Sequence, residues 1–258
     1  MSEPSTTGEL TAAQAIARTA QPILEFARGW MINRDTAARG DELGLLPGRG
    51  FWVVGRCGVL GDVDADVVAN AIGFMAPTDV RRYWEHRPSD RPARELATEY
   101  AECAYRWGRG ALAGMDEARL RRLDQLGRAV ADAALPQLGA LFAGWRAMPA
   151  PPDAAAAVTL TLHVLRELRG GAHLLAVLGS GMHPAEAALA APPPRGGMEW
   201  ARDLGWSGPY PDEVAAGWKR TQADAQTSVL CVPAFEALSG AERAELADLV
   251  DEARAAIG

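Results

Sequence analysis

The sequence predicts a mainly α-helical protein, and three observations support this class. Helix-start signals recur along the chain, including two capping boxes in which Thr11 is followed by Gln14 and Ser239 by Glu242. Between these signals, apolar residues recur at helical spacing, and proline-rich stretches separate the segments that show this spacing. One short run, residues 51–60, has a β-like composition, and glycines interrupt it. The expected architecture is therefore bundle-like, with little β structure.

Each helix expected in the first half of the chain has a residue that favours its start. Asp64 and Asp116 can accept hydrogen bonds from the free backbone amides of a first helical turn, as Thr11 does. Pro77 and Pro92 have the φ angle that suits such a turn. The helices expected here are 11–32, 65–75, 78–86, 93–113 and 117–146.

The proline-rich stretch 148–153 predicts a rigid break, because proline lacks an amide donor and crowds the residue before it. It divides an N-terminal helical half, 11–147, from a C-terminal half, 154–258, and the two halves are expected to form one compact unit. Residues 1–10 are polar and acidic, so we expect a disordered tail there.

The segment 154–180 is apolar on nearly all sides and is expected to form a central helix. It contains the pair Gly170-Gly171, although each glycine in a helix costs about 1 kcal/mol relative to alanine. Such a pair indicates a kink or the close approach of another backbone. Further helices are expected at 197–204, 211–229 and 240–256.

Length and composition restrict the class of protein further. A chain of 258 residues, 48% of them hydrophobic, is long enough to bury a sizeable core. No apolar run reaches the ~18 residues of a membrane-spanning helix, and the first residues lack a signal-peptide pattern. The three cysteines lie far apart, so neither a disulfide framework nor a zinc site is expected. These features predict a cytoplasmic protein without membrane contact, metal or cofactor.

The charge distribution argues against nucleic acid as the partner. The chain has a net charge of −7, and residues 205–258 contain four basic and nine acidic residues. The arginines between residues 81 and 94 alternate with acidic residues, which is typical of a solvated, salt-bridged surface. Because phosphate neutralisation supplies most non-specific affinity for DNA, nucleic-acid binding is not expected.

Five ionisable residues interrupt the apolar pattern of the central segment, namely His163, Arg166, Glu167, Arg169 and His173. Buried charges are costly unless they are paired. One interpretation is an ion-pair network that locks this helix to its neighbours. The other is the polar corner of a ligand pocket, with His173 as a hydrogen-bond donor, a ligand or an acid–base group. In the last role its expected partner is Glu167 or Arg166. The two histidines lack the i, i+4 spacing of a helical metal site.

Aromatic residues give a second indication of a binding site. The chain has eight tryptophans, most of which are expected in the core because each buries a large area. The others are enough to line a pocket for a flat or bulky ligand. Arg56, the one charge within its apolar run, either pairs with a carboxylate or faces an anionic group of the ligand. The expected ligand-binding residues are Trp52, Arg56, Phe74, Tyr83, Trp84, His163, Arg166 and Arg169.

Four segments of the chain carry a resemblance to a known family. Residues 50–61 form an aromatic-rich stretch ending in Leu-Gly, and Gly-Phe-Met-Ala-Pro precedes Val80 and Trp84. Two further segments follow in order, namely Leu-Arg-Glu-Leu-Arg-Gly-Gly-Ala-His at 165–173 and the tail from Thr227. In these segments the chain resembles the MarR-like tandem winged-helix proteins of actinobacteria, which are helix-turn-helix regulators. The resemblance implies two winged-helix halves around the central helix.

Two departures from that family pattern shape the functional hypotheses. About twenty residues lie between Trp206 and Thr227, too few for a recognition helix and a β-wing, and Cys57-Gly58 replaces an expected Ala-Pro. The leading hypothesis is therefore a binding protein for a hydrophobic, partly aromatic metabolite, acting as a sensor or as a natural-product pathway accessory. The alternatives are a ligand-responsive transcriptional regulator, for which a homodimer is the expected form, and a metabolite-modifying enzyme that uses His173 as an acid–base group.

Overall fold

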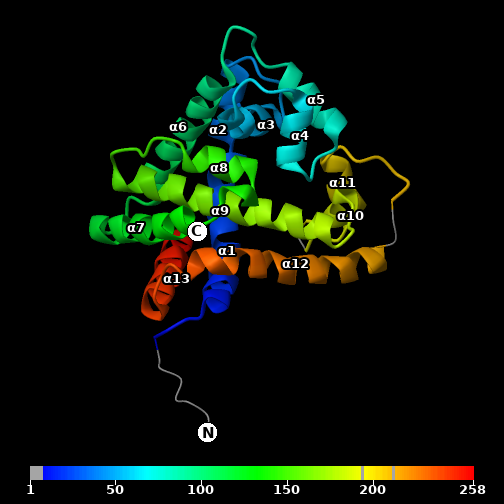
Figure 1. The fold of residues 1–258 in the computed structure, drawn as a ribbon. Helices are drawn as coiled ribbons and strands as arrows, with labels where there is room; N and C mark the ends of the chain where they lie inside the picture. Colours follow the sequence, from blue (N-terminus) through cyan, green and yellow to red (C-terminus); the bar gives the residue numbers. More distant parts are fainter. Residues whose placement is uncertain (1–7, 193–194, 211–212) are drawn as a thin grey trace.

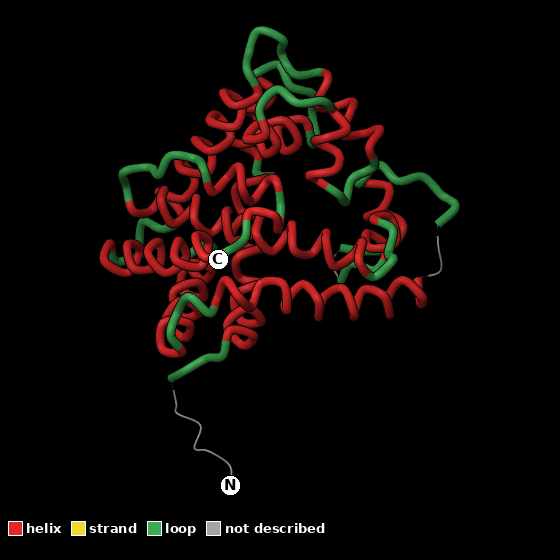
Figure 2. The backbone as a smooth tube through the Cα atoms, in the orientation of Figure 1, coloured by secondary structure: helices red, strands yellow, loops and turns green. Residues whose placement is uncertain are grey.

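The computed structural model describes residues 8–192, 195–210 and 213–258, and within them it contains only helices, turns and loops (Figures 1 and 2). The predicted mainly α-helical class is confirmed. The α-helices are α1 (Ala12–Met31), α2 (Arg34–Glu42), α3 (Gly50–Cys57), α4 (Ala65–Ile72), α5 (Pro77–Glu85), α6 (Ala93–Ala111), α7 (Glu117–Ala133), α8 (Ala140–Arg146), α9 (Ala154–Gly179), α10 (Pro184–Leu189), α11 (Gly197–Asp203), α12 (Glu213–Phe235) and α13 (Gly240–Ala255). Two short 3-10 helices, η1 (Gly58–Leu60) and η2 (Pro136–Leu138), complete the described elements.

Local chemistry at the helix starts agrees with the sequence. Both predicted capping boxes form, at Thr11 with Gln14 before α1 and at Ser239 with Glu242 before α13. The Asp116 carboxylate accepts hydrogen bonds from the first amides of α7. Asp64 stands at the N-cap of α4 without a side-chain hydrogen bond, so its role there is weaker than expected.

The central position of α9 is confirmed. It packs against α1, α6, α7, α8 and α12, and Figure 1 shows it crossing the middle of the molecule between α8 and α12. The Asp153 side chain caps the start of α9 by accepting a hydrogen bond from the Ala156 amide, at 2.9 Å. Because neighbours cover α9 on most sides, its apolar residues are buried around the whole helix axis in its first half.

The run 51–60 is helical, so its β-like interpretation is wrong. It comprises all of α3 after Gly50, followed by η1, and it is buried on nearly every side. Its glycines serve close packing, because a Cβ at Gly58 would lie 2.1 Å from the Ala93 carbonyl oxygen of α6. Periodicity does not distinguish a fully buried strand from a fully buried helix, which explains the error.

The segment 117–146 is also not one helix. It divides into α7, η2 and α8, because Pro136 lacks the amide that would continue the helix. The last long helix differs as well, since α12 continues to Phe235 rather than ending at residue 229. The predicted start of that helix at residue 211 lies outside the described residues.

The two sequence halves are in extensive contact. Helix α1 packs against α9, α12 and α13, and Arg18 of α1 pairs with Asp248 and Asp251 of α13.

Of the expected tail 1–10, residues 1–7 lie outside the described residues, whereas the Leu10 amide donates a hydrogen bond to the Gly240 carbonyl. None of the described helices combines the length and apolarity that crossing a bilayer requires.

Candidate ligand pocket

A buried ion-pair cluster joins α3 to α9. The Arg56 guanidinium donates two hydrogen bonds to the Glu167 carboxylate, from Nε to Oε1 at 2.7 Å and from Nη2 to Oε2 at 2.8 Å. Arg166 donates a further hydrogen bond to Glu167 Oε1. The Glu167 side chain is 1% exposed and that of Arg56 is 7% exposed. The predicted ion-pair network is therefore present, and it holds the two helices together.

The network keeps Glu167 ionised. Burial alone would raise the pKa of this carboxyl, but Arg56 and Arg166 hold it well below its usual range. Burial would lower the pKa of Arg56, yet the Glu167 carboxylate raises it above its ordinary value. Arg56 also lies over the Trp52 ring, 4.7 Å from its centroid, because the two residues are four apart on one face of α3. Glu167 is thus a structural counter-ion rather than a free acid–base group.

His163 belongs to the core of the fold. Its ring lies edge-on to Trp30 and Trp145, with centroid distances of 5.1 and 4.4 Å. Neither ring nitrogen makes a hydrogen bond with a described residue. Burial lowers the pKa of His163 from 6.5 to about 3, so the ring is neutral at physiological pH.

We expect His163 to make the fold acid-sensitive. Since its folded pKa lies below its unfolded value, the unfolded chain binds the proton first, and the free energy of unfolding falls as the pH drops below 6.5 towards 3. We expect the His163→Met variant to reduce the slope of the free energy of unfolding against pH by about 1.4 kcal/mol per pH unit. Urea denaturation at pH 7, 6 and 5 measures it, with the exposed His86→Gln as the control. An unchanged slope in His163→Met contradicts the assignment.

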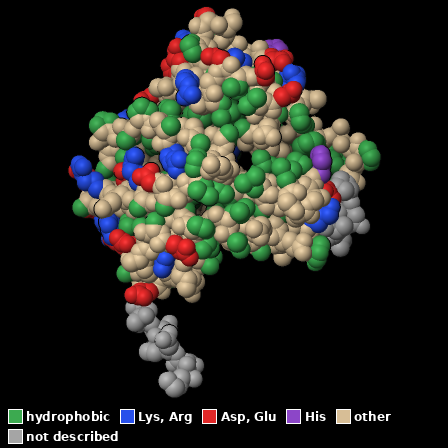
Figure 3. Space-filling model, viewed as in Figure 1, with side chains coloured by type: hydrophobic (Ala, Val, Ile, Leu, Met, Phe, Trp, Pro, Cys, Tyr) green, Lys and Arg blue, Asp and Glu red, His purple; other side chains and the backbone are tan. Residues whose placement is uncertain are grey.

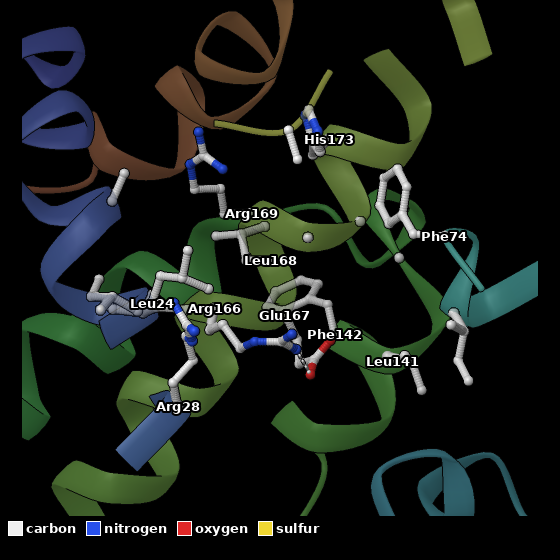
Figure 4. A pocket seen from close by; sticks show the side chains of 18 of the residues that line it. Leu24, Arg28, Phe74, Leu141, Phe142, Arg166, Glu167, Leu168, Arg169 and His173 are labelled. Atoms are coloured by element: carbon white, nitrogen blue, oxygen red, sulfur yellow. Dashed lines mark hydrogen bonds and ion pairs between the residues drawn. The ribbon is translucent and has the colours of Figure 1, made fainter. Parts of the chain in front are cut away.

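Beside the ion-pair cluster lies a cavity of about 510 Å³. Its described walls come from α1, α3, α4, α8, α9, α10, α11 and α12 and from the loops between them. Figure 3 shows that the face viewed there is hollowed near its centre, with hydrophobic side chains gathered around the hollow. Figure 4 shows the cavity from close by, with Leu24, Phe74 and Leu168 among the side chains in its wall. The ion pairs therefore leave room beside α9.

Most of the residues expected at a site lie in this wall. Those that line the cavity are Trp52, Arg56, Phe74, Arg166, Glu167, Arg169 and His173. Four of them lie on α9, and the fold brings Trp52, Arg56 and Phe74 from the first third of the chain to the same space. Whether they bind a ligand stays a prediction.

Tyr83, Trp84 and His163 do not line the cavity, so their expected place in its wall is wrong. Trp84 is 1% exposed, and its indole nitrogen donates a hydrogen bond to the Val63 carbonyl at 2.8 Å. Tyr83 is also buried on α5. These rings fill the core around α4 and α5, because large apolar side chains are buried by whichever neighbours the fold provides.

His173 holds a defined orientation at one end of the cavity. Its Nδ1 lies 2.9 Å from the Thr227 hydroxyl, which itself donates to the Ala223 carbonyl at 2.6 Å. Because a hydroxyl has one proton, His173 Nδ1 is the donor to Thr227. Burial and Arg220 lower the pKa of His173 to about 4, so it is neutral near pH 7.

The expected acid–base pair of His173 with Glu167 does not form. The two side chains have different hydrogen-bond partners, and both oxygens of Glu167 accept from Arg56. Phe74 stacks on the His173 ring at a centroid distance of 5.4 Å. In the described part of the chain, no three His, Cys, Asp or Glu side chains are placed to hold a metal ion.

A large share of the cavity wall has no clear signal in the sequence. Lining residues outside the expected set include Leu24, Arg28, Arg49, Leu141, Phe142, Arg195, Trp200 and Arg220. Leu24 and Arg28 are four residues apart in a segment that was correctly predicted to be helical, so they share one face of α1. This spacing is the one sign in the sequence that Leu24 and Arg28 could face the same space. An arginine on a helix is usually solvated, so the spacing alone does not predict a place in the wall.

Four of the five arginines from Arg81 to Arg94 form ion pairs, as predicted for this segment, and the exception among the described residues is Arg94. Arg81 pairs with Asp66 and with Glu85, and Arg91 pairs with Glu95 at 3.1 Å. Further pairs join Arg82 to Asp79 and Arg87 to Asp62. These carboxylates compete with phosphate for the arginines.

Comparison with protein-family models gives a match over most of the chain. The model of a helix-turn-helix family matches residues 13–216, which include the cavity walls from α1 to α11. No curated protein and no solved structure shows significant similarity to the chain.

Proposed function

This chain belongs to a helix-turn-helix family, and on that premise we propose that it binds a hydrophobic, partly aromatic small molecule in the cavity beside α9. It serves as a sensor or as an accessory of a biosynthetic pathway. The observation that carries the proposal is the cavity itself. Its volume of about 510 Å³ falls within the range of about 300–1,000 Å³ that ligand pockets occupy.

The composition of the wall supports the proposal. Apolar and aromatic side chains supply most of the surface a ligand would meet, including Trp52, Phe74, Phe142 and Trp200. A few polar groups converge on the same space, and His173 is held in one orientation by Thr227. An apolar wall with a small number of oriented polar groups is the usual arrangement of a small-molecule site.

Partly filling the cavity should weaken binding. We expect the neutral fluorophore N-phenyl-1-naphthylamine to bind the wild-type protein with a rise in emission, and Leu24→Trp to weaken this binding roughly tenfold or more. The larger ring occupies space that the probe needs, since Leu24 lines the cavity (Figure 4). Leu135→Trp is the matched control, because Leu135 is 65% exposed and is not among the lining residues.

Two results would count against the proposal. One is the absence of any saturable emission change with the wild-type protein. The other is equal affinity of the Leu24→Trp and Leu135→Trp variants, which would place the probe outside the cavity. A thermal-shift screen of small metabolites then identifies the class of natural ligand, with Leu24→Trp as the negative reference.

A DNA-binding regulator is the second candidate, and the family match favours it. The net charge of −7 and the ion-paired arginines between residues 81 and 94 weigh against it. Fluorescence anisotropy of a labelled random-sequence duplex at about 50 mM salt tests it. We expect no saturable binding in the range of about 10⁻⁶ to 10⁻⁴ M typical of non-specific DNA affinity. Saturable, salt-sensitive binding in that range would favour the regulator.

A further inference from the structure

The cavity is lined by far more positive than negative charge. Within the described residues its wall contains seven arginines and two carboxylates, although the whole chain has a net charge of −7. The arginines are Arg28, Arg49, Arg56, Arg166, Arg169, Arg195 and Arg220. The carboxylates are those of Glu167 and Asp224. This local excess is opposite in sign to the rest of the molecule.

The two carboxylates do not neutralise the arginines. Glu167 is shared between Arg56 and Arg166, and Asp224 pairs with Arg220 at 3.0 Å. Among the described residues, three of the lining arginines form no ion pair with a carboxylate. These are Arg28, Arg169 and Arg195. The wall therefore offers guanidinium groups that are available to a further anion.

These unpaired arginines are also partly removed from water. Arg28, Arg169 and Arg195 are all half-buried. The Nε atoms of Arg166 and Arg169 are buried and make no hydrogen bond with a described residue. Figure 4 shows Arg28 on α1 and Arg166 and Arg169 on α9 in the wall of the one cavity. An unmatched cation in such a place is costly, and a bound anion would offset that cost.

Several of these cations lie close enough to repel one another. Burial lowers the pKa of Arg195, and the nearby charges of Arg28, Arg166 and Arg220 lower it further. The four residues come from α1, α9, the loop before α11, and α12, so the fold brings them together. An anion placed among them would replace repulsion by charge-assisted hydrogen bonds.

We propose that the cavity selects an organic anion, with a carboxylate, sulfonate or phosphate group held by Arg28, Arg166 and Arg195. The hydrophobic body of this ligand lies against Trp52 and Phe74. Arginine suits this role because its planar fork of donors matches the oxygens of such groups. This inference rests on the proposed small-molecule binding and adds the chemical class of the ligand.

Two probes with one ring system test the inference. 1-Anilinonaphthalene-8-sulfonate is an anion, and N-phenyl-1-naphthylamine is the same ring system without the sulfonate. We expect the wild-type protein at pH 7.5 to bind the anion roughly tenfold or more tightly than the neutral probe. Raising the salt concentration should weaken the binding of the anion more than that of the neutral probe.

The variants are Arg28→Gln, Arg195→Gln and the double variant. Neither residue pairs with a carboxylate among the described residues, so these changes leave the cluster of Arg56, Arg166 and Glu167 intact. We expect the double variant to lose most of the preference for the anion and to keep its affinity for the neutral probe within about threefold. The charge-matched control is Arg121→Gln, an exposed arginine outside the cavity wall. It should retain the wild-type preference.

The outcomes separate the two proposals. Equal binding of both probes by the wild-type protein overturns the anion inference and leaves the small-molecule site standing. A preference that persists in the double variant, with thermal melting showing a folded protein, also overturns it. If the double variant does not fold, the two single variants decide the matter in the same way. Binding of neither probe overturns the proposed function and this inference with it.

Discussion

We expect the Glu167→Gln variant to lose about 3–5 kcal/mol of unfolding free energy. The substitution keeps the size of the side chain and removes its charge. Arg56 and Arg166 then remain as cations in the interior, where Arg56 is only 7% exposed and has no other described carboxylate within reach. Urea denaturation at pH 7 measures the loss, and the pH matters little because the Glu167 pKa lies well below its usual range.

A surface pair provides the control for this effect. Glu117 forms an i, i+4 pair with Arg121, and both side chains are more than two-thirds exposed. Glu117→Gln should change the free energy of unfolding by less than about 0.5 kcal/mol, because water screens the pair. If Glu167→Gln were no more destabilising than Glu117→Gln, the cluster would not be the lock between α3 and α9.

Two adjacent glycines should respond in opposite directions to the same substitution. A Cβ at Gly171 would lie 2.0 Å from the Leu138 carbonyl oxygen and 2.9 Å from the Cα of Gly139, both in the backbone around η2. Gly171→Ala must therefore displace backbone, and we expect a loss of about 2–3 kcal/mol in the free energy of unfolding. A Cβ at Gly170 meets nothing closer than 4.0 Å. Gly170→Ala should gain up to about 1 kcal/mol from helix propensity.

Chemical denaturation of both alanine variants checks this contrast. The two proteins differ by one residue in position and not at all in composition, so the unfolded chains are closely matched. Equal denaturation midpoints would show that η2 does not press against α9 as the structure has it. The sequence alone indicated a kink or a close approach at this pair, and the structure assigns the close approach to Gly171.

The parts of the fold that the sequence predicted well depend on local chemistry. Thr11 with Gln14 and Ser239 with Glu242 satisfy amides a few residues away, so their pattern needs no knowledge of the rest of the chain. The helical state of the run 51–60 cannot be predicted locally, because its burial comes from helices distant in the sequence. A buried helix and a buried strand share the same apolar composition, and only the partners decide between them.

The candidate site could be predicted only in part for the same reason. The polar residues of α9 were visible as charges in an apolar pattern, and Arg56 as a charge in an apolar run. Arg56 pairs with Glu167, which lies 111 positions away, and no local pattern reveals such a pairing. Arg28 and Arg195 were overlooked because a single arginine usually indicates a solvated surface. Tyr83 and Trp84 were placed wrongly because size and apolarity do not identify the cavity a ring will face.

The cavity beside α9 is the central claim, and a crystal structure of the complex with 1-anilinonaphthalene-8-sulfonate tests it most directly. We expect one probe molecule per chain inside the cavity, its rings near Trp52 and Phe74 and its sulfonate within hydrogen-bond distance of Arg28, Arg166 or Arg195. A probe bound only on the outer surface, or a cavity filled by the protein's own side chains, would contradict it.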